Sequence, residues 1–117
     1  MTTATDIANK ALTRIGVKTF DNAVDAGVLA QVKGSLTDLH ELFVSLPTPL
    51  ANWELDAIPS AAVGPLVDEL AWYIRDDFTV PPSKVKSLMA AQQAARRALY
   101  ALIEIPYDGE PTEADYF

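Results

Sequence analysis

Two adjacent prolines, Pro81 and Pro82, divide the second half of this chain into two long amphipathic segments. Proline lacks a backbone N–H, and its ring clashes with the preceding helical turn, so a regular helix does not run through such a pair. Apolar residues recur at helical spacing on both sides of the prolines. We therefore expect a hairpin of two helices over Ser60–Ile103, with the prolines at the hinge.

Charge is divided unevenly over this hairpin. Its second arm, Ser83–Ile103, holds four of the nine Lys and Arg residues of the chain and none of the sixteen Asp and Glu residues. The whole chain has a formal net charge of −7, which favours solubility and disfavours broad, non-specific nucleic-acid binding. A basic helix in an acidic protein indicates either that it holds a partner or that it holds its own chain together.

Helical periodicity also organises the first half of the chain. We expect a first helix that begins at a Thr3 or Thr5 cap and ends at Gly16. Asp25 is expected to cap a second helix, which ends before Pro47. The apolar stripe of this second helix consists of Val28, Leu29, Val32, Leu36, Leu39, Leu42, Phe43 and Leu46.

The segment after the second helix predicts a lid on the core. Leu50–Pro59 carries three large apolar residues, Trp53, Leu55 and Ile58, in a short loop. A chain of 117 residues suits one domain with a single core. The predicted fold class is all-α: a small bundle of about four helices over residues 1–104, followed by an extended C-terminal arm over residues 105–117.

Two features of the third helical segment shape its interpretation. Pro65 would remove an intrahelical hydrogen bond if the helix began at Ser60, so we expect Gly64 to act as the cap. On a helical wheel, Trp72 falls opposite the apolar stripe. The residues around it are acidic: Asp68, Glu69 and Asp76. An outward Trp is often an interface anchor, although in a small domain another loop can simply cover it.

The last helix, which we expect Ser83 to cap, has three faces. The leucine side consists of Val85, Leu88, Met89, Leu99, Leu102 and Ile103, the alanine side of Ala90, Ala91, Ala94 and Ala98, and a third strip of Lys86, Gln93, Arg97 and Tyr100. The alanine side favours close packing of a neighbouring helix, in a compact bundle or an oligomer, over plain surface filling. Lys86 and Arg97 are interpreted as a solvated face, with contact to nucleic acid as the alternative.

Arg96 interrupts the leucine side of the last helix, together with Gln92. A charge in that position requires a partner. Asp77, at the end of the third helix, is one candidate within the chain, and an acidic group of a neighbouring subunit is the other.

The residues available for catalysis are few. The chain has no Cys, and His40, its only histidine, lies beside the apolar stripe of the second helix, where a structural role is expected. Nucleophile elbows, His/Cys metal clusters and phosphate-cradling glycine loops are missing from the sequence. We therefore expect no catalytic residues, no metal and no cofactor. The chain shows no signal-peptide pattern and no apolar run near the ~20 residues of a membrane span, so a soluble cytoplasmic protein is expected.

The C-terminal segment Ile105–Phe117 combines four acidic residues and two prolines with three aromatic residues. Such a segment is either disordered or docks into the grooves of a partner, and its spaced aromatic side chains favour docking. The candidate residues for a partner or oligomer interface are Trp72, Lys86, Arg96, Arg97, Tyr107, Tyr116 and Phe117.

The order of these features resembles that of head-to-tail connector proteins of tailed bacteriophages, also called adaptor or head-completion proteins. The opening DIANKALTRIGV, residues 6–17, is similar to their first helix of the form I-N-x-A-L-x-x-I-G. The likeness continues in the Leu/Val stripe of the second helix, the loop with Trp53, the turn RDDFTVPP at residues 75–82, and an Ala- and Arg-rich last helix before an arm. The chain departs from the pattern at Thr13-Arg14, where many relatives have a charged-hydrophobic pair, and in its proline-rich Leu46–Ile58 loop.

The resemblance implies a structural virion protein that forms a ring of roughly twelve copies beneath the portal protein. Such a ring would join the portal to a tail protein or to a stopper or nozzle protein. It would extend the DNA channel without sequence-specific DNA binding, and no membrane would be involved. The resemblance also implies that the arm Ile105–Phe117 grips the portal or a neighbouring subunit, and that Lys18–Ala26 contacts neighbours or tail proteins. The expected location is the head-tail junction of the virion, and the host cytoplasm during assembly.

Two other classes of function remain as alternatives. In a helix-turn-helix DNA-binding regulator, Pro81-Pro82 would form the turn and Ser83–Ile103 the recognition helix. The length of that helix, the presence of only Lys84 and Lys86 in its first turn, and the acidic chain disfavour this alternative. A small enzyme is the third possibility, but it lacks a candidate nucleophile-base pair.

Overall fold

The computed structural model describes residues 3–16, 25–47, 49–51, 53–55 and 57–104. This part of the chain folds into four α-helices and one short 3-10 helix: α1 (Ala4–Arg14), α2 (Ala26–Ser45), α3 (Ser60–Tyr73), η1 (Arg75–Asp77) and α4 (Pro82–Glu104). The predicted all-α class with four helices is confirmed. The arm expected over residues 105–117 and residues 18–24 of the expected contact loop lie outside the described residues.

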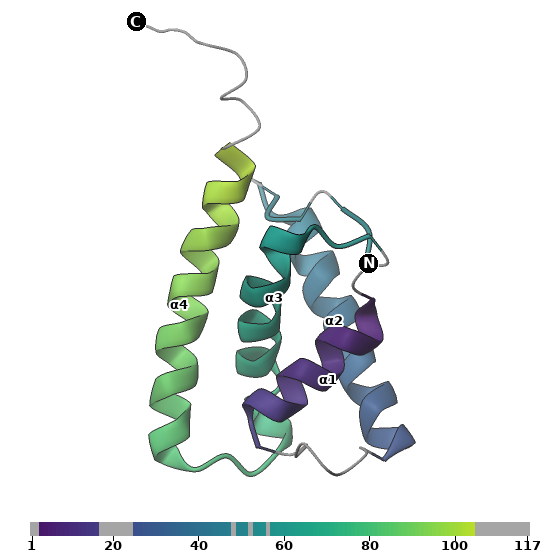
Figure 1. The fold of residues 1–117 in the computed structure, drawn as a ribbon, viewed down its shortest axis with the longest axis vertical. Coiled ribbons are helices and arrows are strands. Elements are labelled where there is room, and N and C mark those ends of the chain that lie inside the picture. The colour runs from purple at the N-terminus through teal and green to yellow at the C-terminus, as the bar shows by residue number, and fades with distance from the viewer. Residues whose placement is uncertain (1–2, 17–24, 48, 52, 56, 105–117) are drawn as a thin grey trace, which may run out of the picture.

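Helix α3 lies at the centre of the bundle (Figure 1). Helix α4 runs antiparallel along one side of it, while α1 and α2 pack against its other sides and against each other. The predicted hairpin is therefore present, with η1 and the two prolines at its hinge. Because three helices surround α3, it lacks the broad solvent-facing side that an outer helix of a bundle has.

Local signals set the ends of α1 and α2. Thr3 and Asp6 form a reciprocal cap: the Thr3 hydroxyl accepts from the Asp6 amide at 3.3 Å, and the Asp6 carboxylate accepts from the Thr3 amide at 3.1 Å. Gly16 follows α1 with a φ of +88°, a left-handed conformation that favours glycine. The Asp25 carboxylate caps α2 by accepting from the amides of Gly27 at 2.9 Å and Val28 at 3.4 Å. These three predictions from the sequence are confirmed.

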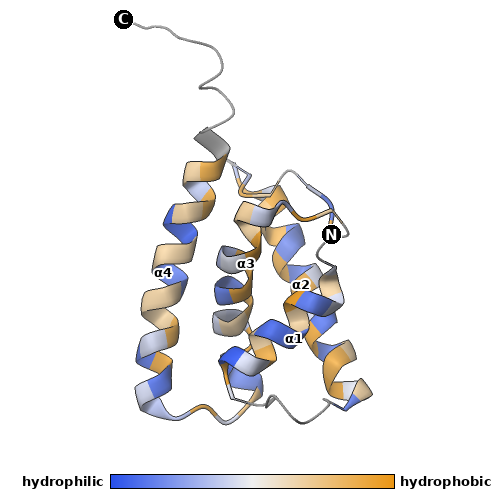
Figure 2. Cartoon of the chain, in the orientation of Figure 1, coloured by the Kyte–Doolittle hydropathy of each residue, from blue (hydrophilic) through white to orange (hydrophobic). Residues whose placement is uncertain are grey.

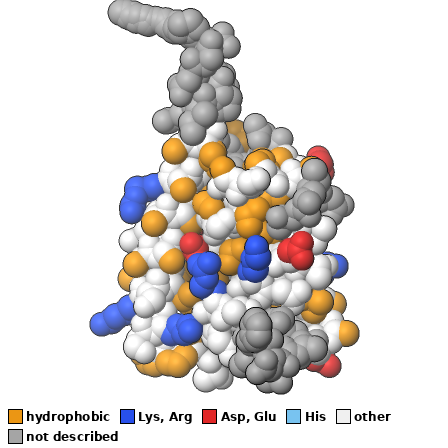
Figure 3. All heavy atoms as spheres, viewed as in Figure 1, with side chains coloured by type: hydrophobic (Ala, Val, Ile, Leu, Met, Phe, Trp, Pro, Cys, Tyr) orange, Lys and Arg blue, Asp and Glu red, His pale blue; other side chains and the backbone are white. Residues whose placement is uncertain are grey.

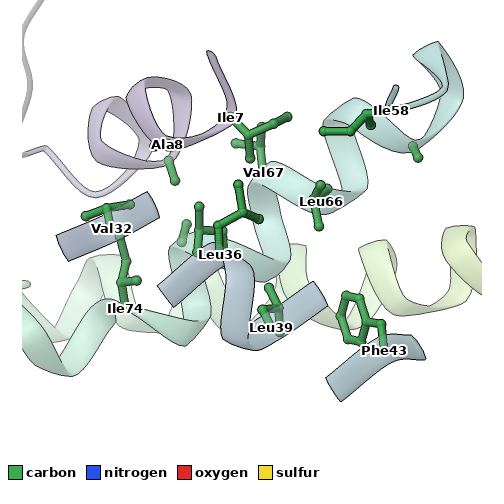
Figure 4. Packing of buried hydrophobic residues seen from close by; sticks show 14 of the residues in the cluster. Ile7, Ala8, Val32, Leu36, Leu39, Phe43, Ile58, Leu66, Val67 and Ile74 are labelled. Carbon is green, nitrogen blue, oxygen red and sulfur yellow. The ribbon is translucent and has the colours of Figure 1, made fainter. Parts of the chain in front are cut away.

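The core is a single cluster of apolar side chains from all four helices. Figure 2 shows hydrophobic residues concentrated where the helices face each other, and Figure 4 shows side chains of α1, α2 and α3 meeting in the interior. Its largest fully buried apolar members are Ile7, Leu12, Val32, Leu36, Phe43, Leu66, Val67, Leu70, Ile74 and Leu99. Leu42 departs from the predicted stripe of α2, because its side chain is 46% exposed.

The segment between α2 and α3 covers one end of this core. Ile58 is buried, and Trp53 and Leu55 pack partly buried against the core cluster, which confirms the predicted lid. His40 of α2 holds the lid in place. Its Nε2 lies 2.7 Å from the Trp53 carbonyl oxygen, and the centres of the His40 and Trp53 rings are 5.5 Å apart. Since a carbonyl oxygen only accepts, Nε2 carries the proton in this contact. The histidine therefore has the structural role expected from the sequence.

Two predicted helix starts are wrong. Helix α3 begins at Ser60 rather than after Gly64, so that Pro65 lies inside it without the hydrogen bond to the preceding turn. The additional turn packs against the core, where it buries Ala62 completely. Helix α4 begins at Pro82, and the Pro81 carbonyl accepts from the amides of residues 84 and 85, so Ser83 lies within the first turn instead of capping it.

Candidate functional site

Trp72 does not face outward as the helical wheel predicted. Its side chain is partly buried and packs against the core cluster. The Arg75 guanidinium lies 3.6 Å from the centre of the indole ring, and its Nη1 donates to the Trp72 carbonyl at 2.8 Å. The wheel assumed that α3 has one buried face, whereas helices contact it on several sides. Trp72 therefore contributes to packing within the chain.

Arg96 binds Glu69 of α3, which is neither of the two predicted partners. Its Nε donates to Glu69 Oε2 at 2.7 Å, and its Nη2 donates to Oε1 at 3.1 Å. The Gln92 amide donates to the same Oε1 at 3.2 Å. Hydrogen bonding to Glu69 raises the pKa of Arg96, against the opposing effect of burial. Asp77, the predicted partner within the chain, lies exposed in η1.

This contact joins α3 to α4 in one register. The Glu69 side chain is only 2% exposed, so its charge requires compensation inside the protein, and Arg96 and Gln92 supply it. The Arg96 guanidinium also lies 5.3 Å from the centre of the Phe43 ring of α2. Arg96 is thus mainly a structural residue, whose charge is used within the chain.

The outward surface of α4 is exposed within the described residues, and we call it the outer face of α4. It consists of the exposed residues Lys86, Met89, Ala90, Gln93, Ala94, Arg97, Ala98, Tyr100 and Ala101. Met89 and Tyr100 are each 43% exposed. The opposite face of the helix buries Leu88, Ala95 and Leu99 against α3. Among the described residues, the bundle therefore leaves Ala90, Ala94 and Ala98 of the alanine side exposed.

A second surface was not recognised in the sequence: a hollow between the end of α1 and the beginning of α4, which we call the basic hollow. It consists of two neighbouring pockets, of about 500 Å³ and about 460 Å³, which share Arg14 and Lys84 as lining residues. The remaining lining residues are Lys10 and Thr13 of α1, and Ser83, Ser87, Leu88 and Ala91 of α4. Three cations thus surround a hollow in a protein whose net charge is −7.

The residues that end α1 and begin α4 place the cations of the basic hollow. Gly16 ends α1 just after Arg14, and Pro82 begins α4 just before Lys84, so both cations lie at helix ends that line the same pockets. Arg14 is held in place by an ion pair with Asp68 of α3. Figure 3 shows several Lys and Arg side chains on the face of the molecule that carries α1 and α4, with acidic side chains among them. The sequence contained a partial signal, since Lys10 and Arg14 share the outer side of α1.

The other predicted interface residues fall into two groups. Lys86 and Arg97 are exposed on α4, as the wheel predicted. Tyr107, Tyr116 and Phe117 lie outside the described residues. Within the described ranges, no group of three or more His, Cys, Asp or Glu side chains is placed to hold a metal ion. No helix in that part of the chain is long and apolar enough to cross a membrane.

Comparison with known proteins gives no assignment, because the chain matches no family model, no curated protein and no solved structure.

Proposed function

We propose that this protein is a structural assembly protein, a ring-forming head-to-tail adaptor of a tailed bacteriophage. Roughly twelve copies would join the portal to a tail, stopper or nozzle protein and extend the DNA channel. The proposal starts from the order of features in this chain, which resembles that of head-to-tail connector proteins. These features are the short first helix, the lid with Trp53, the acidic-aromatic turn, and the Ala- and Arg-rich last helix. It places the protein at the head-tail junction of the virion.

The observation that carries the proposal is the outer face of α4. Alanine side chains at Ala90, Ala94 and Ala98 leave a smooth exposed strip on a helix of 23 residues. Small side chains allow a neighbouring helix to approach closely, because the distance between packed helices depends on the side chains at the contact. Exposed Met89 and Tyr100 belong to residue types that are enriched in protein–protein interfaces. This face suits the contact between subunits of a ring.

The charge of the chain is compatible with a DNA channel. A net charge of −7 on each subunit gives a ring that repels the phosphate backbone at long range. DNA could then pass through such a ring without being held. The expected partners are other copies of the chain, the portal protein and a tail protein, and DNA would be in transit only.

The experiment that tests this proposal is a measurement of molar mass by light scattering, on the full-length protein alone and after addition of portal protein. We expect a species of roughly twelve chains of 12.7 kDa each, alone or on the portal. A monomer under both conditions would contradict the proposal.

A helix-turn-helix regulator is the second candidate, favoured by Lys84 and Lys86 in the first turn of α4. Less supports it, because the two helices of such a motif cross at about 90–120°, whereas α3 and α4 run antiparallel along their length (Figure 1). A gel-shift experiment with duplex DNA at ~50 mM salt distinguishes the two candidates. A salt-dependent shift would favour the regulator, and an unshifted duplex would remove it.

A further inference from the structure

We propose that the basic hollow binds the acidic C-terminal segment, residues 105–117, of a second copy of this chain. The inference rests on the proposed assembly of copies, and it names the contact that links them. The outer face of α4 and the basic hollow would then be two separate surfaces of one oligomer.

The hollow has the chemistry to bind an acidic peptide. Among the described residues, neither Lys10 nor Lys84 has a carboxylate within ion-pairing distance, while Arg14 is oriented by Asp68 and remains about half exposed. The hydroxyl groups of Ser83 and Ser87 add hydrogen-bonding capacity. Leu88 and Ala91 supply an apolar floor. Cationic and apolar side chains that line neighbouring pockets suit a ligand that carries both carboxylates and aromatic rings.

The C-terminal segment is such a ligand by sequence. IPYDGEPTEADYF contains four carboxylate side chains, three aromatic residues and no Lys or Arg. Charge complementarity of this kind fixes the register of a peptide and speeds its association.

Distance favours a second copy over the same chain. The hollow lies at the beginning of α4 and the segment starts at the other end of that helix (Figure 1). Twenty residues separate Lys84 from Glu104, which corresponds to about 30 Å along a helix. Thirteen residues reach at most about 45 Å when fully extended. Within one chain, Asp108 and Glu110 lie too close to Glu104 to reach the hollow, because six residues span at most about 22 Å. A second copy can present all four carboxylates.

A contact between opposite ends of two copies is heterologous, because each copy uses a different surface. Contacts of this type generate rings when the rotation between subunits closes. Nucleic-acid phosphates are the other class of anion that could enter the hollow. The net charge of −7 opposes a long polyanion more than a short peptide, which favours the peptide.

The first test uses a synthetic peptide of residues 105–117 and NMR spectra of the full-length protein at low salt. We expect the amide signals of residues 83–88 and of the last turn of α1 to shift. Lys10→Glu with Lys84→Glu should weaken binding about tenfold or more, as expected for the loss of two ion pairs. The matched control compares single charge reversals: Lys33 is exposed on α2, outside both the hollow and the outer face of α4, so Lys33→Glu should bind like the wild type while Lys84→Glu binds more weakly. Equal weakening by Lys33→Glu and Lys84→Glu would overturn the proposal.

The second test asks whether the contact joins two chains. One variant carries Lys10→Glu and Lys84→Glu, and the other carries Glu110→Lys and Glu113→Lys. In each variant alone, the charges of the hollow and of the segment no longer complement each other, so light scattering should show a lower molar mass than for the wild type. In an equimolar mixture, each hollow again meets a segment of opposite charge on the other variant. Recovery in the mixture supports docking between copies. Variants that assemble like the wild type, or a mixture that stays dissociated, overturn it. Circular dichroism checks that both variants keep their helices.

These outcomes separate the contact from the proposed function. If the wild-type protein forms a ring, and neither charge reversal changes the molar mass or the peptide-induced shifts, the role of the hollow is overturned. The adaptor proposal is not affected by that result. A protein that forms no ring with portal, yet binds the peptide at the hollow, removes the adaptor and keeps the recognition of the segment. A short DNA duplex that produces the same amide shifts at lower concentration than the peptide would assign the hollow to nucleic acid and overturn the proposal.

Discussion

Glu69 is the buried charge on which α3 and α4 align. It lies on the α4 side of α3, and both of its oxygens accept hydrogen bonds from α4. An apolar residue at this position would pack in many registers, whereas the carboxylate has only one position that satisfies both Arg96 and Gln92. The pair therefore specifies how the two helices fit, more than it adds to stability.

We expect Glu69→Leu to destabilise the fold by about 3 kcal/mol, because removing one partner of a buried pair leaves the other uncompensated. The cost falls at the low end of the usual range, since the Arg96 side chain is 36% exposed and can reach water. The double variant Glu69→Leu with Arg96→Met should recover most of the loss. Urea unfolding of the three proteins measures these differences, and equal stability of both variants would contradict this role of the pair.

Asp6 makes stability depend on pH through the cap of α1. The hydrogen bond from the Thr3 amide holds the pKa of Asp6 below its ordinary value of 3.8. A carboxyl group whose pKa is lowered on folding stabilises the protein above its unfolded pKa, and this contribution disappears as the pH falls through the folded pKa. We expect wild type to be more stable than Asp6→Asn at pH 6 and the difference to narrow below pH 3.8. Urea midpoints measured from pH 6 to pH 2.5 check this; a constant difference would contradict it.

The ends of helices were predictable where the signal is local. Thr3, Gly16 and Asp25 act through their own backbone or the next few residues, and the structure has each in the predicted place. The start of α3 differs from the prediction because its first turn packs on the core, where Ala62 is buried, and a contact with distant parts of the chain is not visible in the local sequence around Pro65. The faces of α3 were missed for a related reason, because a wheel describes one helix and does not include the helices around it.

Pro65→Ala tests this account of α3. Alanine restores the backbone N–H that the helix lacks at this position, and we expect a gain of about 1 kcal/mol after the loss of proline packing and chain stiffness. Pro82→Ala is the matched control, because Pro82 is the first residue of α4 and interrupts no bond there. Its effect should stay within about 0.5 kcal/mol. Thermal or urea unfolding measures both, and an unchanged or lower stability of Pro65→Ala would mean that the proline ring contributes more through packing than it costs.

At the scale of the whole molecule, the sequence indicated a helical protein with an unusual last helix, and the structure separates two surfaces on it. Arg96, which was expected at an interface, is used inside the chain, while the alanine side stays open. The basic hollow could not be predicted, because Lys10 and Lys84 are distant in sequence and only the fold brings α1 to the beginning of α4. For Arg96 and for the basic hollow alike, the sequence does not say which other helix lies next to these residues.

The outer face of α4 can be tested by one substitution at its middle. Ala94→Glu places a carboxylate where a neighbouring helix would pack, and a charge buried there without a partner should weaken association at least tenfold. Ala30→Glu makes the same change at an exposed position of α2 and serves as the control. Glutamate is a good helix former, so both variants should melt like the wild type as monomers. We expect light scattering to show a lower molar mass for Ala94→Glu than for the wild type, and an unchanged molar mass for Ala30→Glu. If both variants assemble alike, the subunits of the proposed ring do not meet on this face, and α4 contributes to assembly only through the residues at its beginning.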